Sequence, residues 1–164
     1  MRNGILTLVL SFLQVSCSDI GTGPPGRYLD LSLRYGVLAR NELNTFNDRF
    51  TKDLILDGTA TTTLVLSPAD FDSIEPHLRA IDILEYADTF VVLTRDTIVS
   101  INPYQTYILK VRMGSRWKEV FWEDSIISAD PRATQLREAV EFIRALVQSK
   151  PEYKQLPPAR GGYG

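Results

Sequence analysis

Apolar and polar residues alternate along residues 27–35 of the chain, RYLDLSLRY. Side chains two positions apart lie on the same side of a β-strand, so this alternation predicts a strand with one buried face. Residues 50–56 and 60–66 have strand-like composition, and Asp57-Gly58 between them is typical of a tight hairpin turn. Residues 36–48 have no such pattern, and we interpret them as a loop.

Two more hairpins are predicted in the second half of the chain. Residues 104–113 and 116–122 alternate on either side of Gly114-Ser115, which supplies the turn. The β-rich runs FVVL and TIVSI flank Thr94-Arg95-Asp96, so we expect another hairpin within residues 89–101. Strands joined by such short turns pair in the antiparallel direction.

A first helix is predicted to begin at Ser67-Pro68, because serine caps a helix start and proline fits the first helical position. Pro76 should end or kink this helix near Glu75, since proline removes a helical hydrogen bond. The apolar residues of the helix have helical spacing: Phe71, Ile74, Leu78 and Ile81.

A second helix is predicted to begin at Asp130-Pro131 and to stop at Lys150-Pro151. Its buried stripe should consist of Leu136, Val140, Ile143 and Val147. We expect Val140 and Ile143 to pack against the sheet face that carries Leu109 and Val111. Residues 27–150 thus predict a single α+β domain, an antiparallel sheet built from hairpins with two helices packed on one face.

The first seventeen residues have the three parts of a secretory signal peptide. Residues 1–3 are polar and positive, residues 4–13 form an apolar run, and a small residue, Ser16, precedes Cys17. Ten apolar residues are too few to cross a hydrocarbon layer ~30 Å thick as a helix. We therefore predict that residues 1–16 are a signal peptide.

With a cysteine at the cleavage point, this segment resembles a bacterial lipoprotein signal peptide, although Gln14 stands where that family favours leucine. The resemblance implies that Cys17 carries a lipid and becomes the first residue after cleavage. It also implies a lipid anchor in the bacterial cell envelope, and Ser18 favours the outer membrane. Residues 17–26, rich in Gly and Pro, would then form a flexible tether. The alternatives are a secreted protein with a free thiol and an uncleaved anchor.

Composition limits the chemistry that the chain can perform. A formal charge of −2 offers no electrostatic footprint for nucleic acid. One cysteine excludes an internal disulfide, and His77 is the single histidine, so a metal site is poorly supplied. We interpret His77 as a surface residue, and the adjacent acids Glu123 and Asp124 as facing opposite sides of a strand. We therefore expect no cofactor and no catalytic activity.

The predicted hairpin at residues 104–122 has five aromatic residues, because Tyr107 and Phe121 accompany the three that we take as a candidate binding patch: Tyr104, Trp117 and Trp122. Because side chains alternate along a strand, some aromatics of this hairpin must lie on the face away from the helices. Trp and Tyr are enriched in interface hot spots, so exposed members of this set would bind a partner. The alternative is that these aromatics cover the edge of the core.

Residues 66–82 (LSPADFDSIEPHLRAID), residues 107–124 (YILKVRMGSRWKEVFWED) and the closing helix are similar to small domains on bacterial lipoproteins. More distantly, they are similar to emfourin-type inhibitors of thermolysin-like metalloproteases. Emfourins usually have a glycine pair after their first strand, where this chain has only Gly36, so no inhibitory residue is carried over.

We therefore expect a lipid-anchored envelope protein with a non-catalytic binding or structural role. Its expected partners are a membrane, through the lipid, and an envelope protein. The alternatives are a protease-inhibitor-like domain and an envelope enzyme whose site the sequence does not reveal. The last segment, residues 151–164, is rich in Pro and Gly and is interpreted as a tail without regular structure.

Overall fold

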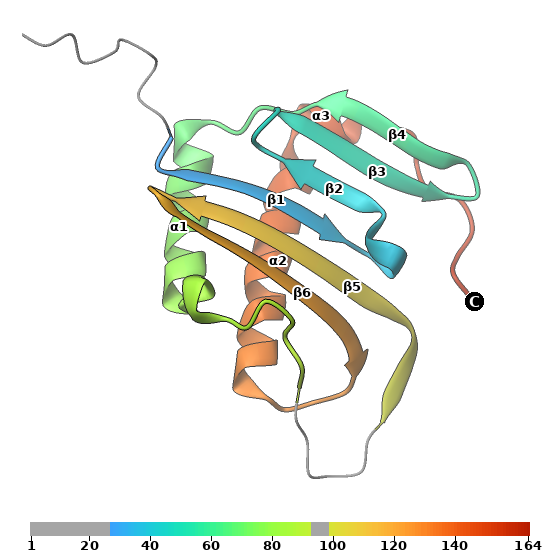
Figure 1. Ribbon diagram of the computed structural model, residues 1–164. Helices are drawn as coiled ribbons and strands as arrows, with labels where there is room; N and C mark the ends of the chain where they lie inside the picture. The colour runs from blue at the N-terminus through green and yellow to red at the C-terminus, as the bar shows by residue number, and fades with distance from the viewer. Residues whose placement is uncertain (1–26, 93–98) are drawn as a thin grey trace, which may run out of the picture.

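The computed structural model describes residues 27–92 and 99–164, which form a six-stranded antiparallel sheet with helices covering one of its faces (Figure 1). This is the α+β architecture that the sequence predicts. The strands are β1 (Leu29–Tyr35), β2 (Asn41–Asn44), β3 (Arg49–Ile55), β4 (Gly58–Thr63), β5 (Ser100–Met113) and β6 (Arg116–Ile126). The helices are α1 (Pro68–Ala80), α2 (Pro131–Ser149) and the short α3 (Pro151–Lys154), with 3-10 turns at Val37–Ala39 and Ile83–Glu85.

The strand order across the sheet is β4-β3-β2-β1-β5-β6, so β1 lies in the interior between β2 and β5. Leu33 lies opposite Leu43 of β2 on one side and Leu109 of β5 on the other. The hairpins predicted around Asp57-Gly58 and Gly114-Ser115 are confirmed as β3–β4 and β5–β6.

Both helix starts are fixed by the caps that the sequence predicts. In α1, the Ser67 side chain accepts the Asp70 backbone N–H, and the Asp70 carboxylate accepts the Ser67 backbone N–H at 2.7 Å. In α2, the Asp130 carboxylate accepts the backbone N–H groups of Arg132 and Ala133 at 2.8 and 3.2 Å. These bonds satisfy N–H groups that have no partner within the helix.

The core lies between the helices and the sheet. The predicted stripe of α2 is confirmed, because Leu136, Val140, Ile143 and Val147 are at most 1% exposed. Leu109 and Val111 belong to the same buried cluster, as the predicted packing of α2 on the sheet requires. Burial of these apolar side chains is the main favourable contribution to folding.

The interpretation of residues 36–48 as a loop is wrong. They contain the 3-10 turn at Val37–Ala39 and strand β2, Asn41–Asn44. The strand has a single buried apolar residue, Leu43, and two asparagines, which are depleted in strands. It forms because both of its edges pair, with β1 and with β3, a long-range effect without a local sequence signal.

Of the two effects predicted for Pro76, a helix end or a kink near Glu75, the end is wrong, because α1 continues through Pro76 to Ala80. Pro76 and Asp72 are exposed, so the carbonyl group that proline leaves without a donor faces the solvent side of the helix. Ile74 and Leu78, on the buried side, are fully buried and hold the helix against the core across this position.

The turn of the hairpin expected within residues 89–101, Thr94-Arg95-Asp96, lies outside the described residues. Of its flanks, Thr89 forms a bridge with Phe121 of β6, and Ser100 begins β5 opposite Ile126. Phe90 and Val92 are buried in the core cluster. These described flanks therefore contact β6.

The segment at residues 151–164 is packed against the domain, and the expectation of no regular structure is wrong for its first turn, α3. Lys52 donates to the Pro157 carbonyl at 2.8 Å. Arg160 donates its backbone N–H to the Leu54 carbonyl at 3.2 Å. The Tyr163 hydroxyl donates to Asp53. Hydrogen bonds with the backbone and side chains of β3 thus hold this segment against the domain, although its composition predicts no such contacts.

Candidate functional site: the open face of the sheet

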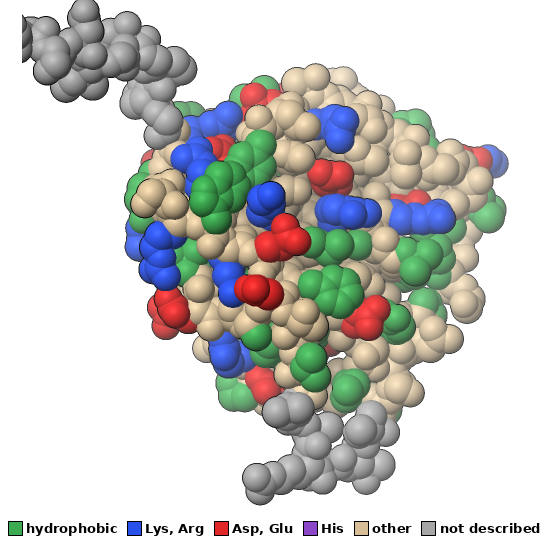
Figure 2. All heavy atoms as spheres, viewed as in Figure 1, with side chains coloured by type: hydrophobic (Ala, Val, Ile, Leu, Met, Phe, Trp, Pro, Cys, Tyr) green, Lys and Arg blue, Asp and Glu red, His purple; other side chains and the backbone are tan. Residues whose placement is uncertain are grey.

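One face of the sheet lies away from α1 and α2, and we call it the open face (Figure 1). Its side chains come from alternate positions of the strands, as the register shows by placing Asp30 opposite Arg112 and Arg112 opposite Trp117. Figure 2 views this side of the molecule and shows hydrophobic side chains interspersed with groups of both charges. The open face therefore carries hydrophobic, positive and negative side chains side by side, and it is not a surface of one charge sign.

An aromatic pair lies on the open face and joins two segments that are distant in sequence. The rings of Phe46, from the β2–β3 turn, and Trp117, from β6, are stacked with centroids 5.4 Å apart and planes 13° apart. Phe46 is 41% exposed and Trp117 is 55% exposed. Exposed aromatic side chains of this size, held in place by a neighbour, are typical of the centre of a binding surface.

Two cations flank the Trp117 ring. The Lys110 ammonium lies 5.5 Å and the Arg112 guanidinium 5.9 Å from the ring centroid, within the range of cation–π attraction. We call the set Phe46, Lys110, Arg112 and Trp117 the Trp117 patch. It combines apolar ring surface with two positive groups, a combination that can accept an apolar or aromatic side chain next to an acidic group.

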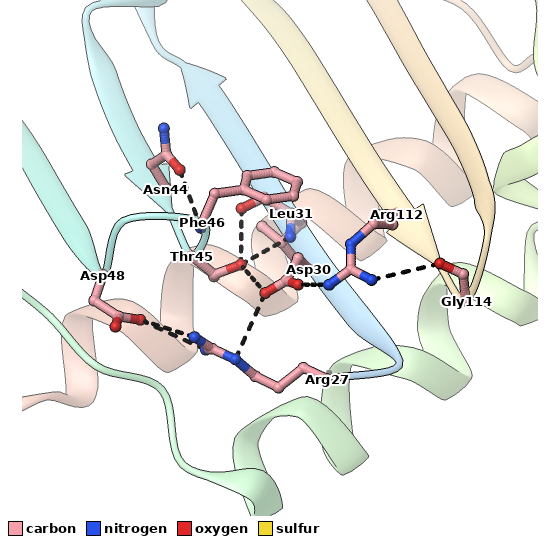
Figure 3. A network of polar contacts seen from close by, with 9 residues as sticks. All are labelled: Arg27, Asp30, Leu31, Asn44, Thr45, Phe46, Asp48, Arg112 and Gly114. Atoms are coloured by element: carbon pink, nitrogen blue, oxygen red, sulfur yellow. Dashed lines mark hydrogen bonds and ion pairs between the residues drawn. The ribbon is translucent and has the colours of Figure 1, made fainter. Parts of the chain in front are cut away.

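A buried carboxylate, Asp30, joins Arg112 of the Trp117 patch to Thr45, the residue before Phe46 (Figure 3). Asp30 is 6% exposed and forms ion pairs with Arg112 and, at 3.6 Å, with Arg27. The Thr45 hydroxyl lies 3.3 Å from the same carboxylate and accepts the Leu31 backbone N–H at 2.9 Å. Because Thr45 directly precedes Phe46, this network fixes the turn from which the Phe46 ring extends.

The predicted patch of Tyr104, Trp117 and Trp122 is only partly exposed. Trp117 lies on the open face, but Trp122 is 1% exposed and packs against Tyr107 and Phe90 in the core, so its assignment to an exposed patch is wrong. Trp117 and Trp122 are separated by an odd number of positions, which places them on opposite faces of β6.

Tyr104 is half-buried on β5, far along that strand from Arg112, the residue that lies opposite Trp117 of β6. Its hydroxyl donates to Glu123 at 3.1 Å, and this carboxylate raises the pKa of Tyr104. Tyr104 therefore forms a contact of its own at the other end of the β5–β6 hairpin.

Glu123 and Asp124 lie on opposite sides of β6, as the strand pattern predicts. Asp124 is 7% exposed and pairs with Arg137 of α2 through two hydrogen bonds, at 2.5 and 2.8 Å. This pairing raises the pKa of Arg137. The two acids thus have separate structural partners and do not converge on one point.

His77 is exposed on α1, where its ring stacks on Phe142 of α2 with centroids 3.8 Å apart. Its Nδ1 lies 3.0 Å from the Ser73 carbonyl oxygen. Within residues 27–92 and 99–164, no group of three or more His, Cys, Asp or Glu side chains could hold a metal ion. His77 accordingly contributes to the contact between α1 and α2.

Sequence reasoning missed four residues of this surface: Asp30, Phe46, Lys110 and Arg112. Phe46 lies in a segment interpreted as a loop, and its pairing with Trp117 depends on the order of the strands. Asp30 had a weak signal, since an acid at an outward position of a strand and an arginine on another strand can pair across the sheet. Which strands are neighbours could not be read from the sequence.

Comparison with protein-family models, with curated proteins and with solved structures finds no match to this chain. Among the described helices, none is long and apolar enough to cross a membrane. Cys17 and the rest of the predicted signal peptide and tether lie outside the described residues.

Proposed function

We propose that this protein is a lipid-anchored component of the bacterial cell envelope whose domain binds another protein and performs no catalysis. The proposed anchor is a lipid on Cys17, at the end of a segment with a positive start, an apolar run and a small residue before the cysteine. The proposed binding surface is the Trp117 patch.

The observation that carries the proposal is the exposure of Trp117 on the open face, stacked on Phe46 and flanked by two cations. A tryptophan that only served the fold would gain more from burial, as Trp122 does at 1% exposure. Trp and Arg are the residues most often found at interface hot spots. The partner surface that fits the patch is an apolar or aromatic side chain beside a carboxylate.

Site-specific photocrosslinking in intact cells tests this proposal. A benzophenone amino acid is placed at position 117 of the full chain or, as the matched control, at position 145, because Ala145 is exposed on α2 on the other side of the domain. We expect a discrete protein adduct at position 117 in the membrane fraction and none at position 145. The absence of an adduct at position 117, or equal adducts at both positions, would overturn the proposed surface.

The anchor is tested separately by intact-mass analysis of the protein purified from a bacterium that processes lipoproteins. We expect a mass that begins at Cys17 and includes added acyl groups. A Cys17→Ser variant should remain unlipidated and leave the membrane fraction or keep its leader. A wild-type mass without acyl groups would refute the anchor.

A further inference from the structure

We infer that an apolar groove between the start of β1 and α1 binds one aliphatic chain of the lipid on Cys17. This inference rests on the proposed lipid anchor, and it assigns the anchor a second position besides the membrane. The groove has a volume of about 290 Å³, and its lining shares no residue with the Trp117 patch.

The groove is lined mainly by apolar side chains. Leu29, Leu66 and Phe71, each at most 8% exposed, line it from the core. Val65, 59% exposed, and Tyr28, 49% exposed, line it nearer the solvent. Large exposed apolar residues gathered around a hollow favour an apolar ligand over a polar one.

The chain that would carry the lipid joins the domain at the rim of this groove. Arg27 and Tyr28, the first two described residues, both line it. The Tyr28 backbone carbonyl accepts the Gly114 backbone N–H at 2.7 Å. The Tyr28 side-chain hydroxyl accepts a hydrogen bond from the Arg79 guanidinium, also at 2.7 Å.

Arg27 is also held in place. Its guanidinium lies 5.1 Å from the centroid of the Phe71 ring and forms an ion pair with Asp48 at 3.4 Å. The contacts of Arg27 and Tyr28 together fix the point from which the preceding residues extend, and that point is beside the groove.

The distance from Cys17 to this point allows the lipid to reach the groove. Ten residue steps separate Cys17 from Arg27. Ten residues span at most ~35 Å, so a lipid on Cys17 lies within reach of the groove. A ligand on a short tether is presented at an effective concentration in the millimolar range. A groove whose affinity is tighter than millimolar would therefore be occupied for most of the time.

The membrane competes with the groove for the same aliphatic chain of the lipid, because insertion into the membrane also removes methylene groups from water. The groove would therefore be occupied when the protein is out of the membrane, and would shelter apolar surface that otherwise promotes aggregation. The groove also has three charged lining residues, Arg27, Asp72 and Glu75. These residues give it a polar edge beside the bound aliphatic chain.

The test uses the single cysteine of the full chain. Cys17 is alkylated with N-dodecylmaleimide, or with N-ethylmaleimide as the matched control, so that both proteins carry the same thioether and differ only in the aliphatic chain. Methyl NMR spectra of the two proteins are compared at concentrations where both are monomeric. We expect the dodecyl chain to shift the methyl signals of Leu29, Val65 and Leu66, which line the groove.

Two variants distinguish the groove from other apolar surfaces. Val65→Asp introduces a charge at the groove, and Val91→Asp does so at a valine of similar exposure, 61%, outside it. The shift of Leu66 should disappear in Val65→Asp and persist in Val91→Asp. Identical spectra for the two alkylated proteins, or a shift of Leu66 that persists in Val65→Asp, overturn the inference.

These outcomes are independent of whether cells attach a lipid, because the aliphatic chain is attached chemically. A protein that is lipidated in cells but shows no dodecyl-dependent shift would retain the proposed function and lose the groove. A protein that shows the shift but carries no acyl mass in cells would lose the anchor, and the groove would remain an aliphatic-chain site.

Discussion

Replacing Ile143 by alanine should destabilise the domain strongly, because Ile143 is 1% exposed in the middle of the buried stripe of α2. The substitution removes three carbon atoms, and their transfer from water contributes about 0.8 kcal/mol each. Because α2 is fixed by its cap at Asp130 and by its packing on the sheet, the space cannot close fully, and a cavity term adds to the loss. We expect a total loss of about 3–4 kcal/mol in the free energy of unfolding.

Urea unfolding followed by circular dichroism measures this loss. Of a total stability of about 5–15 kcal/mol for a domain, it is a large fraction, so the urea midpoint should fall clearly at an unchanged slope. The melting temperature should fall by about 10 °C. Glu141→Ala is the control, because Glu141 is exposed and its ion pair with Arg144 lies on the surface. It should change stability by about 0.5 kcal/mol or less.

Equal unfolding curves for Ile143→Ala and Glu141→Ala would refute the reasoning. That result would mean that α2 is rotated about its axis or is not docked on the sheet, and the buried cluster as described would be wrong. A smaller loss for Ile143→Ala at a reduced slope would instead indicate a change in the compactness of the unfolded state.

Three further predictions concern single groups. Burial opposes ionisation of Asp70, but the hydrogen bonds from Lys150 and Ser67 together outweigh it and lower the pKa of Asp70 below 3.8. Stability should therefore be lost as pH falls below that value, and less steeply in Asp70→Asn. Burial raises the pKa of Tyr35 from 10.0 to about 12, so stability should be lost as pH rises through this interval, and less steeply in Tyr35→Phe. Gly36→Ala should cost about 1–3 kcal/mol in urea unfolding, since Gly36 has φ 96° and an added Cβ would lie 2.8 Å from the Asn41 amide nitrogen.

Each of these predictions has an outcome that would contradict it. An identical acid profile of stability for wild type and Asp70→Asn would show that the contacts of the Asp70 carboxylate with Lys150 and Ser67 do not lower its pKa. Ionisation of every tyrosine near pH 10 in an ultraviolet titration would contradict the burial of Tyr35. Gly36→Ala should be compared with Gly162→Ala, where an added Cβ meets no atom within 4 Å, and equal stabilities would contradict the strain at Gly36.

The sequence predicted the parts of the fold that local pattern and chemistry determine. Alternation identified β1, β5 and β6, the pair Asp57-Gly58 identified the β3–β4 turn, and Ser67 and Asp130 identified the helix starts. These signals act within a few residues and require no knowledge of distant neighbours. Strand β2 was missed because its stability comes from pairing on both edges, with β1 and β3.

The candidate surface was predicted less completely, for a related reason. Trp117 was one of three aromatics in the predicted patch, but whether Trp117 or Trp122 faces outward depends on which side of the sheet the helices cover. Phe46 and Asp30 could not be associated with Trp117 without the strand order, which places β1 between the β2–β3 turn and β5. Tertiary order therefore determines the surface even where the strands themselves are predictable.

The interior position of β1 has a mechanical consequence for a domain held by its N-terminal segment. Tension applied at Arg27 acts along β1, which is hydrogen-bonded to β2 on one side and to β5 on the other. Those bonds lie across the direction of pull, so they must be sheared together and cannot open one after another as at a sheet edge. A strand that is paired on both edges would thus receive the tension from a tether, and the domain should resist a pulling force better than one tethered through an edge strand.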